Sequence, residues 1–248
     1  MDELKKLRND LDMCDEILID ALRMRCQIIQ EITNYKQKNG LPIYQAEEEE
    51  RKKSKMLAKL DDYEYKKSIM AVYDSVLYRS KRIQSHELFG FNIFLIGFMG
   101  AGKSTISDFL RTVFAMEVVE MDQIIAEREG MSISDIFETY GEEYFRNLET
   151  ELLIEMQSKT NVVISCGGGV PMRERNVVEM KKNGRVVLLT AKPETILSRV
   201  KDNHDRPLLE GNKNVDFIAD LMEKRREKYQ AAADIVIETD GKDKLEIC

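Results

Sequence analysis

The segment Gly97-Phe98-Met99-Gly100-Ala101-Gly102-Lys103-Ser104 follows the apolar run Phe91–Ile96. It fits the pattern G-x-x-x-x-G-K-[ST] in full and in the required place, between a strand and a helix that opens at Lys103. Glycines at these positions let backbone N–H groups turn inward around phosphate oxygens, and the start of the following helix adds its positive dipole end. The sequence therefore predicts a site for the phosphates of a nucleotide.

Two side chains of this loop carry chemistry. We expect Lys103 to reach the β- and γ-phosphates and the Ser104 hydroxyl to ligate Mg²⁺. A GTPase would also carry a D-x-x-G step and an N-K-x-D string; neither occurs in this chain. Their absence argues against a GTPase, and the loop itself indicates a site for nucleotide phosphates and Mg²⁺. The predicted nucleotide-binding residues of the loop are Gly97, Gly100, Ala101, Gly102, Lys103, Ser104 and Thr105.

After this loop, short β-branched runs alternate with helical stretches. The runs are continuously apolar, as expected for strands that are covered on both faces. This alternation predicts an α/β P-loop kinase domain, with a parallel sheet and helices on both faces. The predicted strands are Asn92–Ile96, Val118–Met121, Val162–Ser165, Val186–Leu189 and Ile235–Ile237.

The first 88 residues are organised differently, because glycine and proline are scarce before Phe91. Apolar residues recur every three to four positions from Leu4 to Ile32, which predicts one long helix to about Lys38. Two further helices are predicted at 46–60 and 62–85. Three such helices cannot enclose much core alone and usually dimerise or pack on something else. We therefore expect an all-α domain at 1–88 that dimerises, followed by the α/β domain at 89–248.

Composition excludes several classes of protein. A formal charge of −7 and a pI of about 5.2 argue against a nucleic-acid partner. No apolar run approaches the roughly 20 residues of a membrane span, and the N-terminus lacks the apolar segment of a signal peptide. The cysteines have no metal or redox spacing, and we interpret them as buried thiols of a cytoplasmic protein. They are Cys14, Cys26, Cys166 and Cys248.

Six motifs in the second part form a more specific pattern. They are Gly97–Thr105, Glu120-Met121-Asp122, Phe145-Arg146-x-x-Glu149, Gly167-Gly168-Gly169, Arg206-Pro207-Leu208-Leu209 and Arg225-x-x-x-Tyr229. In order and spacing this set resembles shikimate kinase across about residues 90–248. The resemblance implies ATP-dependent phosphorylation of shikimate, a small carboxylate with three hydroxyls. Another hydroxy acid, such as gluconate, is the alternative acceptor.

The resemblance also implies residue roles. Asp122 would hold ring hydroxyls and act as the candidate base, and Arg146 and Arg225 would bind the carboxylate through planar paired donors. Taken alone, Asp122 could be a helix cap, Arg146 an ion-pair residue and Arg225 part of a solvated face. The assembled pattern favours the substrate roles. Gly167, Gly168 and Gly169 would let the substrate approach the backbone.

Three further positions are assigned by the same resemblance. Arg206 would close over the phosphates as part of a lid, in which His204 is expected to be solvated. Arg199 is the candidate for stacking on the adenine. Glu120 stands where the family usually has aspartate, and it would support Mg²⁺ with a longer arm.

Polar residues on the predicted helices of the first part form a second pattern. Arg25 falls on the apolar stripe between Ala21 and Ile28, so it needs an anionic partner, and Lys36 faces the same way. The further motifs are Leu7-Arg8-x-x-Leu11-Asp12, Pro42-Ile43-Tyr44, Glu49 and Ser80-x-x-x-Gln84. Their spacing resembles the all-helical chorismate mutase across about residues 3–88.

This second resemblance implies the rearrangement of chorismate to prephenate within a homodimer. Arg25 and Arg8 would hold the two carboxylates, with Arg8 serving the site of the other subunit. Lys36 and Gln84 would face the ether oxygen, where negative charge develops. Glu49 would take the ring hydroxyl, and Ser80 would complete the substrate site.

Two departures from the mutase pattern leave alternatives open. Gln45 and Glu48 stand where the family often has aspartate and arginine, and the loss of a positive charge could weaken the binding of chorismate. The alternatives are a catalytically silent dimerisation or regulatory module, and a related lyase acting on isochorismate.

Overall fold

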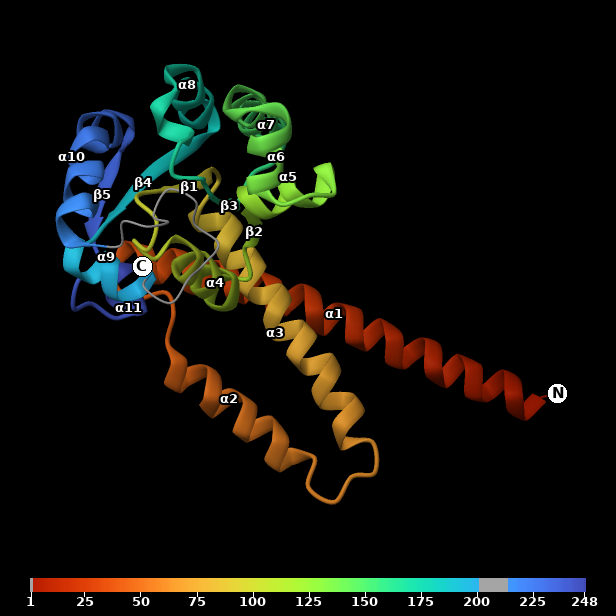
Figure 1. Cartoon of the computed structure of the whole chain (residues 1–248). Helices are drawn as coiled ribbons and strands as arrows, with labels where there is room; N and C mark the ends of the chain where they lie inside the picture. The colour runs from red at the N-terminus through yellow and green to blue at the C-terminus, as the bar shows by residue number, and fades with distance from the viewer. Residues whose placement is uncertain (1, 201–213) are drawn as a thin grey trace. The chain divides into compact units, whose positions relative to one another are not determined.

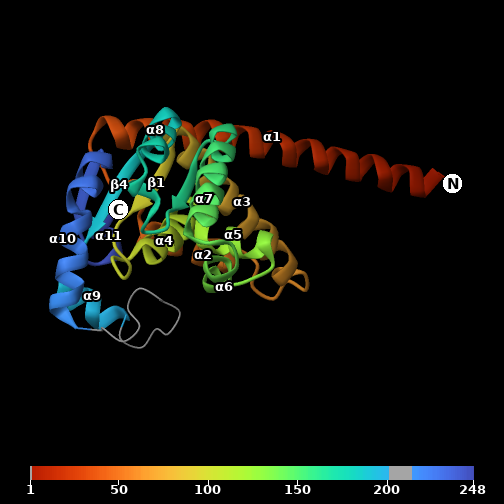
Figure 2. The same ribbon diagram turned by 45° about the horizontal axis from the view of Figure 1, so that its top comes forward.

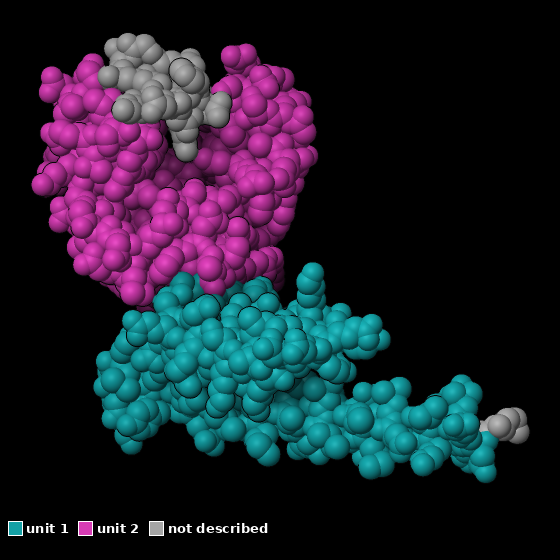
Figure 3. Space-filling view, turned by 90° about the horizontal axis from the view of Figure 1, so that it is seen from below, with its two compact units in different colours: residues 1–88, 113–115 teal, residues 89–112, 116–248 magenta. Residues whose placement is uncertain are grey.

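The computed structural model describes residues 2–200 and 214–248, and Figures 1 and 2 show its ribbon from two directions. The chain divides into two compact units. Unit 1 comprises residues 1–88 with 113–115, and unit 2 comprises residues 89–112 with 116–248 (Figure 3).

Unit 1 is built from three helices, as predicted. They are α1 (Asp2–Lys38), α2 (Ala46–Lys59) and α3 (Lys66–Leu88). The third helix begins four residues later than predicted, because Asp62 takes a left-handed conformation (φ 61°) that no helix accommodates. Only Ile29 and Thr33 of α1 are buried, and α2 has no buried residue. The expectation that these helices enclose little core alone is confirmed.

The predicted apolar stripe of α1 stays exposed in the single chain over most of its length, from Leu4 to Ile28. Its N-terminal half extends beyond the part of α1 that runs beside α3 (Figure 1). Leu7 and Leu11 are 60% and 61% exposed, and Ile28 is 46% exposed. Burial is confined to the C-terminal half of α1, where Ile32, the last residue of the stripe, is half-buried next to the buried Ile29 and Thr33. The stripe is therefore a surface that unit 1 does not cover by itself.

Unit 2 is a parallel sheet of strand order β2-β3-β1-β4-β5. The strands are β1 (Asn92–Ile96), β2 (Glu117–Glu120), β3 (Val162–Ser165), β4 (Gly184–Thr190) and β5 (Ile235–Glu238). All five predicted strands and the fold class are confirmed. The prediction for the second strand ran one residue too far, since Met121 already begins a helix.

Helices lie against both faces of this sheet (Figures 1 and 2). They are α4 (Lys103–Phe114), α5 (Met121–Glu129), α6 (Ile133–Tyr140), α7 (Glu142–Glu155), α8 (Glu174–Asn183), α9 (Pro193–Val200), α10 (Val215–Ala232) and α11 (Lys244–Ile247), with 3₁₀ turns at Met156–Ser158 and Val170–Met172. Every residue of β1 is buried, as expected of a central strand covered on both faces. Because all strands are parallel, their carboxyl ends meet at one edge of the sheet. The loop after β1, the start of α5 after β2 and the glycines after β3 therefore lie together there.

The cysteines were only partly predicted. Cys166 is buried, but Cys14, Cys26 and Cys248 are exposed, so the expectation of four buried thiols is wrong. Cys14 and Cys26 are exposed because they lie on α1, most of whose surface unit 1 leaves uncovered. Among the described residues, no helix has the length and apolar character needed to span a bilayer.

Candidate active sites

The loop after β1 has the geometry of a phosphate cradle. Gly97, Gly100 and Gly102 all have positive φ (143°, 76° and 105°), which disfavours other residues. A Cβ on Gly97 would also lie 2.3 Å from the carbonyl oxygen of Leu189. The loop leads into α4, whose first turn holds Lys103, Ser104 and Thr105, and Ala101 is buried beneath it. The backbone N–H groups of the loop and the N-terminus of α4 are thus available to phosphate oxygens.

Lys103 lies over this loop. Its Nζ donates to the carbonyl oxygens of Gly97 (3.0 Å) and Phe98 (3.2 Å). Both contacts hold the Lys103 ammonium group against the backbone of the loop. That position agrees with the predicted role of Lys103 at the β- and γ-phosphates.

Ser104 and Glu120 approach each other from two elements. The Ser104 hydroxyl donates to Glu120 Oε2 at 3.2 Å, from the first turn of α4 to the end of β2. A hydroxyl and a carboxylate are the hard oxygen donors that Mg²⁺ takes, and this ion keeps several waters and substrate phosphates as its other ligands. The chemistry of this pair fits the metal expected from the sequence.

Arg199 approaches the same loop from α9. Its Nη1 donates to the Gly100 carbonyl (3.0 Å) and to the Thr239 hydroxyl (3.2 Å). Thr239 is buried, and its hydroxyl also contacts the carbonyls of Ala101 and Thr190. Sequence reasoning missed Thr239, since no motif contains it. Arg206 and His204 lie outside the described residues.

The predicted acceptor-site residues meet at the glycines after β3. A Cβ built on Gly167 would lie 2.7 Å from Asp122 Oδ1 and 2.7 Å from Glu149 Oε1. A Cβ on Gly169 would lie 2.1 Å from Arg146 Nη1. These glycines therefore allow the close approach of Asp122 and Arg146.

The middle glycine, Gly168, anchors α10. The Gly168 carbonyl accepts the Tyr229 hydroxyl at 2.7 Å and Arg225 Nη1 at 3.5 Å. Asp122, Arg146, Arg225 and the three glycines are thus brought together, as the sequence pattern predicted. The arrangement places a carboxylate and two guanidinium groups at the same edge of the sheet as the phosphate loop.

Arg146 is already paired with two carboxylates. Its Nη1 lies 2.9 Å from Glu149 Oε2, and its Nη2 lies 2.8 Å from Glu142 Oε1. The guanidinium also packs against the rings of Phe145 and Phe137, at 5.4 and 5.9 Å from their centroids. These contacts fix the arginine in place, so the ion-pair and the substrate interpretations of this residue are compatible.

Glu149 is a site residue to which sequence reasoning assigned no role. Its side chain is fully buried, and within the described residues its Oε1 has no hydrogen-bond partner. Burial raises the pKa of Glu149 to about 7, with the Asp122 carboxylate adding to the rise and Arg146 opposing it. The only signal in the sequence was its place three residues after Arg146, on the same helical face.

This burial predicts a pH dependence of stability. A carboxyl whose pKa is higher in the folded state binds more protons when folded, so the free energy of unfolding falls as pH rises from the ordinary value of 4.5 to about 7. Glu149→Gln is expected to remove this slope, worth about 1.4 kcal/mol per pKa unit. Urea denaturation at several pH values measures it. Glu142→Gln, which removes the exposed partner of Arg146, is the control and should keep the slope; a wild-type slope in Glu149→Gln would mean that another group causes it.

In unit 1, Arg25 is partly buried against α3. Its Nη1 donates to the Ser80 hydroxyl and, at 3.5 Å, to the Val76 carbonyl. Its place on the apolar stripe predicted an anionic partner, but among the described residues its hydrogen-bond partners are neutral oxygens. The positive charge of Arg25 is therefore not neutralised there, which suits a residue that binds a carboxylate of a ligand.

Lys36 lies eleven residues further along the same helix face, as predicted, and its Nζ donates to the Ile43 carbonyl at 2.9 Å. Burial lowers the pKa of Lys36, and the positive charge of Lys52 lowers it further, while Glu48 and Glu49 oppose the change. The residue is thus set among several charges rather than in open solvent.

The other predicted mutase residues are Glu49, Gln84 and Arg8, and they do not all lie near Arg25. Glu49 pairs with Lys81 at 2.8 Å, and Gln84 is half-buried one turn beyond Ser80 on α3. Lys81, which no motif contained, was missed. Arg8 is exposed on the free half of α1, about 25 Å along the helix from Arg25 at 1.5 Å per residue. Within one chain, the structure does not bring Arg8 to Arg25.

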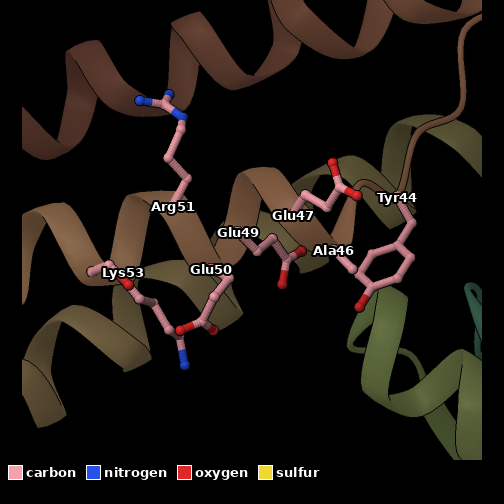
Figure 4. Close-up of a pocket in the computed structure, with 8 residues that line it drawn as sticks. Tyr44, Ala46, Glu47, Glu49, Glu50, Arg51 and Lys53 are labelled. Carbon is pink, nitrogen blue, oxygen red and sulfur yellow. The ribbon is translucent and has the colours of Figure 1, made fainter.

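Two open grooves flank these residues. One, of ≈ 700 Å³, runs along α2 and is drawn in Figure 4. Its lining is Tyr44, Ala46, Glu47, Glu49, Glu50, Arg51, Lys53 and Ser54. The other, of ≈ 420 Å³, is lined by Lys36 and Gln45 with apolar residues of α1, such as Ile28 and Ile32. Neither groove contains all the predicted mutase residues, so the single chain holds that site only in part.

Glu48, one of the two departures, has its charge offset locally. Both of its carboxylate oxygens accept hydrogen bonds from Arg51 at 2.7 Å, and Lys52 lies 3.6 Å away. The hydrogen bonds from Arg51 lower the pKa of Glu48 to about 2. The negative charge at this position is therefore countered by two cations of α2.

Comparisons with known proteins identify both parts of the chain. The family described as shikimate kinase matches residues 99–248, and the family described as chorismate mutase type II matches residues 7–85. The shikimate kinase of Dehalococcoides mccartyi is 42% identical over 157 residues, which cover 63% of this chain and 89% of the relative. That of Geobacter sulfurreducens is 44% identical over 153 residues, covering 62% of this chain and 84% of the relative.

Solved structures agree. A shikimate kinase from Acinetobacter baumannii in complex with shikimate is 34% identical, with a TM-score of 0.59, and the match covers 63% of this chain and 87% of that one. A shikimate kinase from Aquifex aeolicus is 41% identical, with a TM-score of 0.54, covering 63% and 90%. Both resemblances expected from the motifs are confirmed. The chain belongs to the shikimate kinase family, and it carries a chorismate mutase type II domain in its N-terminal part.

Proposed function

We propose that this chain is a bifunctional enzyme of aromatic amino-acid biosynthesis. Unit 2 transfers the γ-phosphoryl group of ATP to a hydroxyl of shikimate, and unit 1 rearranges chorismate to prephenate. The observation that carries the kinase assignment is the meeting of Asp122, Arg146 and Arg225 around Gly167–Gly169, at the sheet edge that also holds the phosphate loop. We take the domain boundary near residue 88 and assign both reactions to the cytoplasm, where ATP and reduced thiols are kept.

In the kinase reaction, Arg146 and Arg225 hold the carboxylate of the acceptor and Asp122 orients its ring hydroxyls. Asp122 accepts the proton of the attacking hydroxyl, and Lys103 stabilises the negative charge on the β- and γ-phosphates. Ser104 and Glu120 are the residues that would hold Mg²⁺, which neutralises phosphate charge when bound. Arg199 and the N–H groups of the loop position the nucleotide.

In the mutase reaction no covalent intermediate is needed, because the rearrangement is pericyclic. Arg25 binds one carboxylate of the dianion. Lys36 and Gln84 donate toward the ether oxygen as its negative charge grows, and Glu49 accepts the ring hydroxyl. Arg8 of the other subunit binds the second carboxylate in a homodimer, since Arg8 lies far from Arg25 within one chain.

The acceptor is tested with the full chain, ATP and Mg²⁺. We expect ADP release that requires shikimate and gives a phosphorylated shikimate, with no comparable rate on gluconate. A chain that releases ADP with gluconate and not with shikimate would contradict the proposed acceptor.

If unit 1 works as a homodimer, dissociating the dimer should lower the mutase activity and leave the kinase activity unchanged. Leu11→Asp places a charge on the exposed stripe of α1 (Leu11 is 61% exposed) and should dissociate the dimer. Loss of the partner's Arg8 should then lower mutase activity at least about tenfold, while kinase activity stays. Leu245→Asp, at a leucine of unit 2 that is 57% exposed, is the matched control. Light scattering with both assays measures the outcome; a dimeric, fully active Leu11→Asp protein would exclude this interface.

A further inference from the structure

A buried serine beside the phosphate loop lies outside the loop motif. Ser107, on α4, is fully buried, and its Oγ lies 2.7 Å from Glu120 Oε1 and 3.0 Å from the Ser104 carbonyl. A hydroxyl has one proton to donate. The carboxylate is both the nearer acceptor and the charged one, so the proton goes to Glu120.

The carboxylate of Glu120 is thereby shared between two serines. Oε1 accepts the Ser107 hydroxyl, and Oε2 accepts the Ser104 hydroxyl at 3.2 Å. Ser104 and Ser107 are three residues apart on α4, so they present their hydroxyls on the same side of the helix. Glu120 reaches this side from the end of β2. One oxygen is thus occupied by a buried donor, and the other lies against the residue that the loop motif assigns to Mg²⁺.

A glutamate needs such an anchor more than an aspartate does. Its side chain has one more rotatable bond, so an unanchored carboxylate at this position would sample several directions. The contact with Ser107 removes that freedom and turns Oε2 toward Ser104. Mg²⁺ demands near-ideal octahedral geometry, and small errors in ligand placement weaken its binding.

We infer that Ser107 is a positioning residue, which holds Glu120 so that Glu120 Oε2 and the Ser104 hydroxyl are preset as a pair of oxygen donors for Mg²⁺. The inference rests on the proposed kinase function, and it assigns a role to a side chain outside the phosphate-loop motif. Ser107 is fully buried, and the role assigned to it is exerted through Glu120.

The test measures metal dependence of nucleotide binding in the full chain, independently of turnover. ADP binding is followed by calorimetry at increasing Mg²⁺, and the Mg²⁺ concentration at half-maximal enhancement is recorded. For Ser107→Ala we expect this midpoint to rise about tenfold, the usual cost of losing a partner of a metal ligand. ADP affinity without Mg²⁺ and the KM for shikimate should stay as in the wild type.

A double-mutant cycle with Glu120→Gln separates positioning from general damage. If Ser107 acts through Glu120, Ser107→Ala causes no further rise of the midpoint when Glu120→Gln is already present. Ser107→Cys keeps nearly the same volume with a weak donor, so its midpoint should rise as well even if the alanine variant folds poorly. An unchanged midpoint in both single variants would overturn the inference, as would an equal effect with and without Glu120→Gln. Since nucleotide binding is read directly, the role of Ser107 can be decided even in a chain that fails to phosphorylate shikimate.

Discussion

Replacing Arg25 with alanine is expected to lower the rate of chorismate rearrangement by about 10²–10³-fold, while shikimate phosphorylation in the same protein is unchanged. Arg25 is partly buried, and its partners in the chain are the Ser80 hydroxyl and the Val76 carbonyl. Its charge is therefore directed to the ligand, and truncating one partner of a buried charge pair costs about 2–5 kcal/mol. Prephenate formation measures the loss.

A matched control lies two residues away. Arg23, on the same helix, pairs with Asp20, and both side chains are 75% exposed. Such an exposed pair contributes little. Arg23→Ala should therefore retain both activities, and if Arg25→Ala also kept its mutase rate, the site assigned to unit 1 would be wrong.

The second large effect is expected at Asp122. Asp122→Asn keeps the shape of the side chain but removes its capacity to accept the proton of the attacking hydroxyl. We expect kcat for shikimate phosphorylation to fall by about 10²–10⁴-fold, the usual contribution of a general base. The KM for shikimate should rise too, because the same side chain holds ring hydroxyls. Shikimate-dependent release of ADP measures both.

Mutase activity serves as the internal standard for this variant, since Asp122 belongs to unit 2. Asp108→Asn is the control, because Asp108 is an exposed carboxylate on α4 that pairs with Arg111. A drop in kcat of less than tenfold in Asp122→Asn would mean that another group takes the proton. Glu149 would then be the first candidate, since both carboxylates border Gly167.

The features of this protein that could be predicted from its sequence are those that depend on residues close together along the chain. The phosphate loop, its strand and its helix are specified within about a dozen positions, so local pattern suffices. Two parts of the predicted acceptor site, Asp122 and Gly167–Gly169, directly follow strands, whereas Arg146 and Arg225 lie inside α7 and α10 and were assigned from the family resemblance. Parallel strands then bring their carboxyl ends together without further information.

Contacts between distant elements were not predictable in the same way. Ser107 and Glu149 acquire their importance from burial and from Glu120 and Asp122, and neither burial nor partner is visible in a single sequence. For the apolar stripe on α1, the sequence predicted the helix but not what covers its apolar face. Its periodicity predicted the helix correctly, but most of its apolar side chains, Cys14 among them, stay exposed in the single chain. Periodicity identifies a face that needs a partner, not the molecule that supplies it.

The bifunctional assignment requires that one chain carry both activities, and a single preparation of the full chain can be assayed for both across a sizing column. We expect prephenate formation from chorismate and shikimate-dependent ADP release to rise and fall together, in one peak with the mass of a dimer. A peak that phosphorylates shikimate and forms no prephenate would contradict the bifunctional assignment, and would make unit 1 a silent dimerisation or regulatory module.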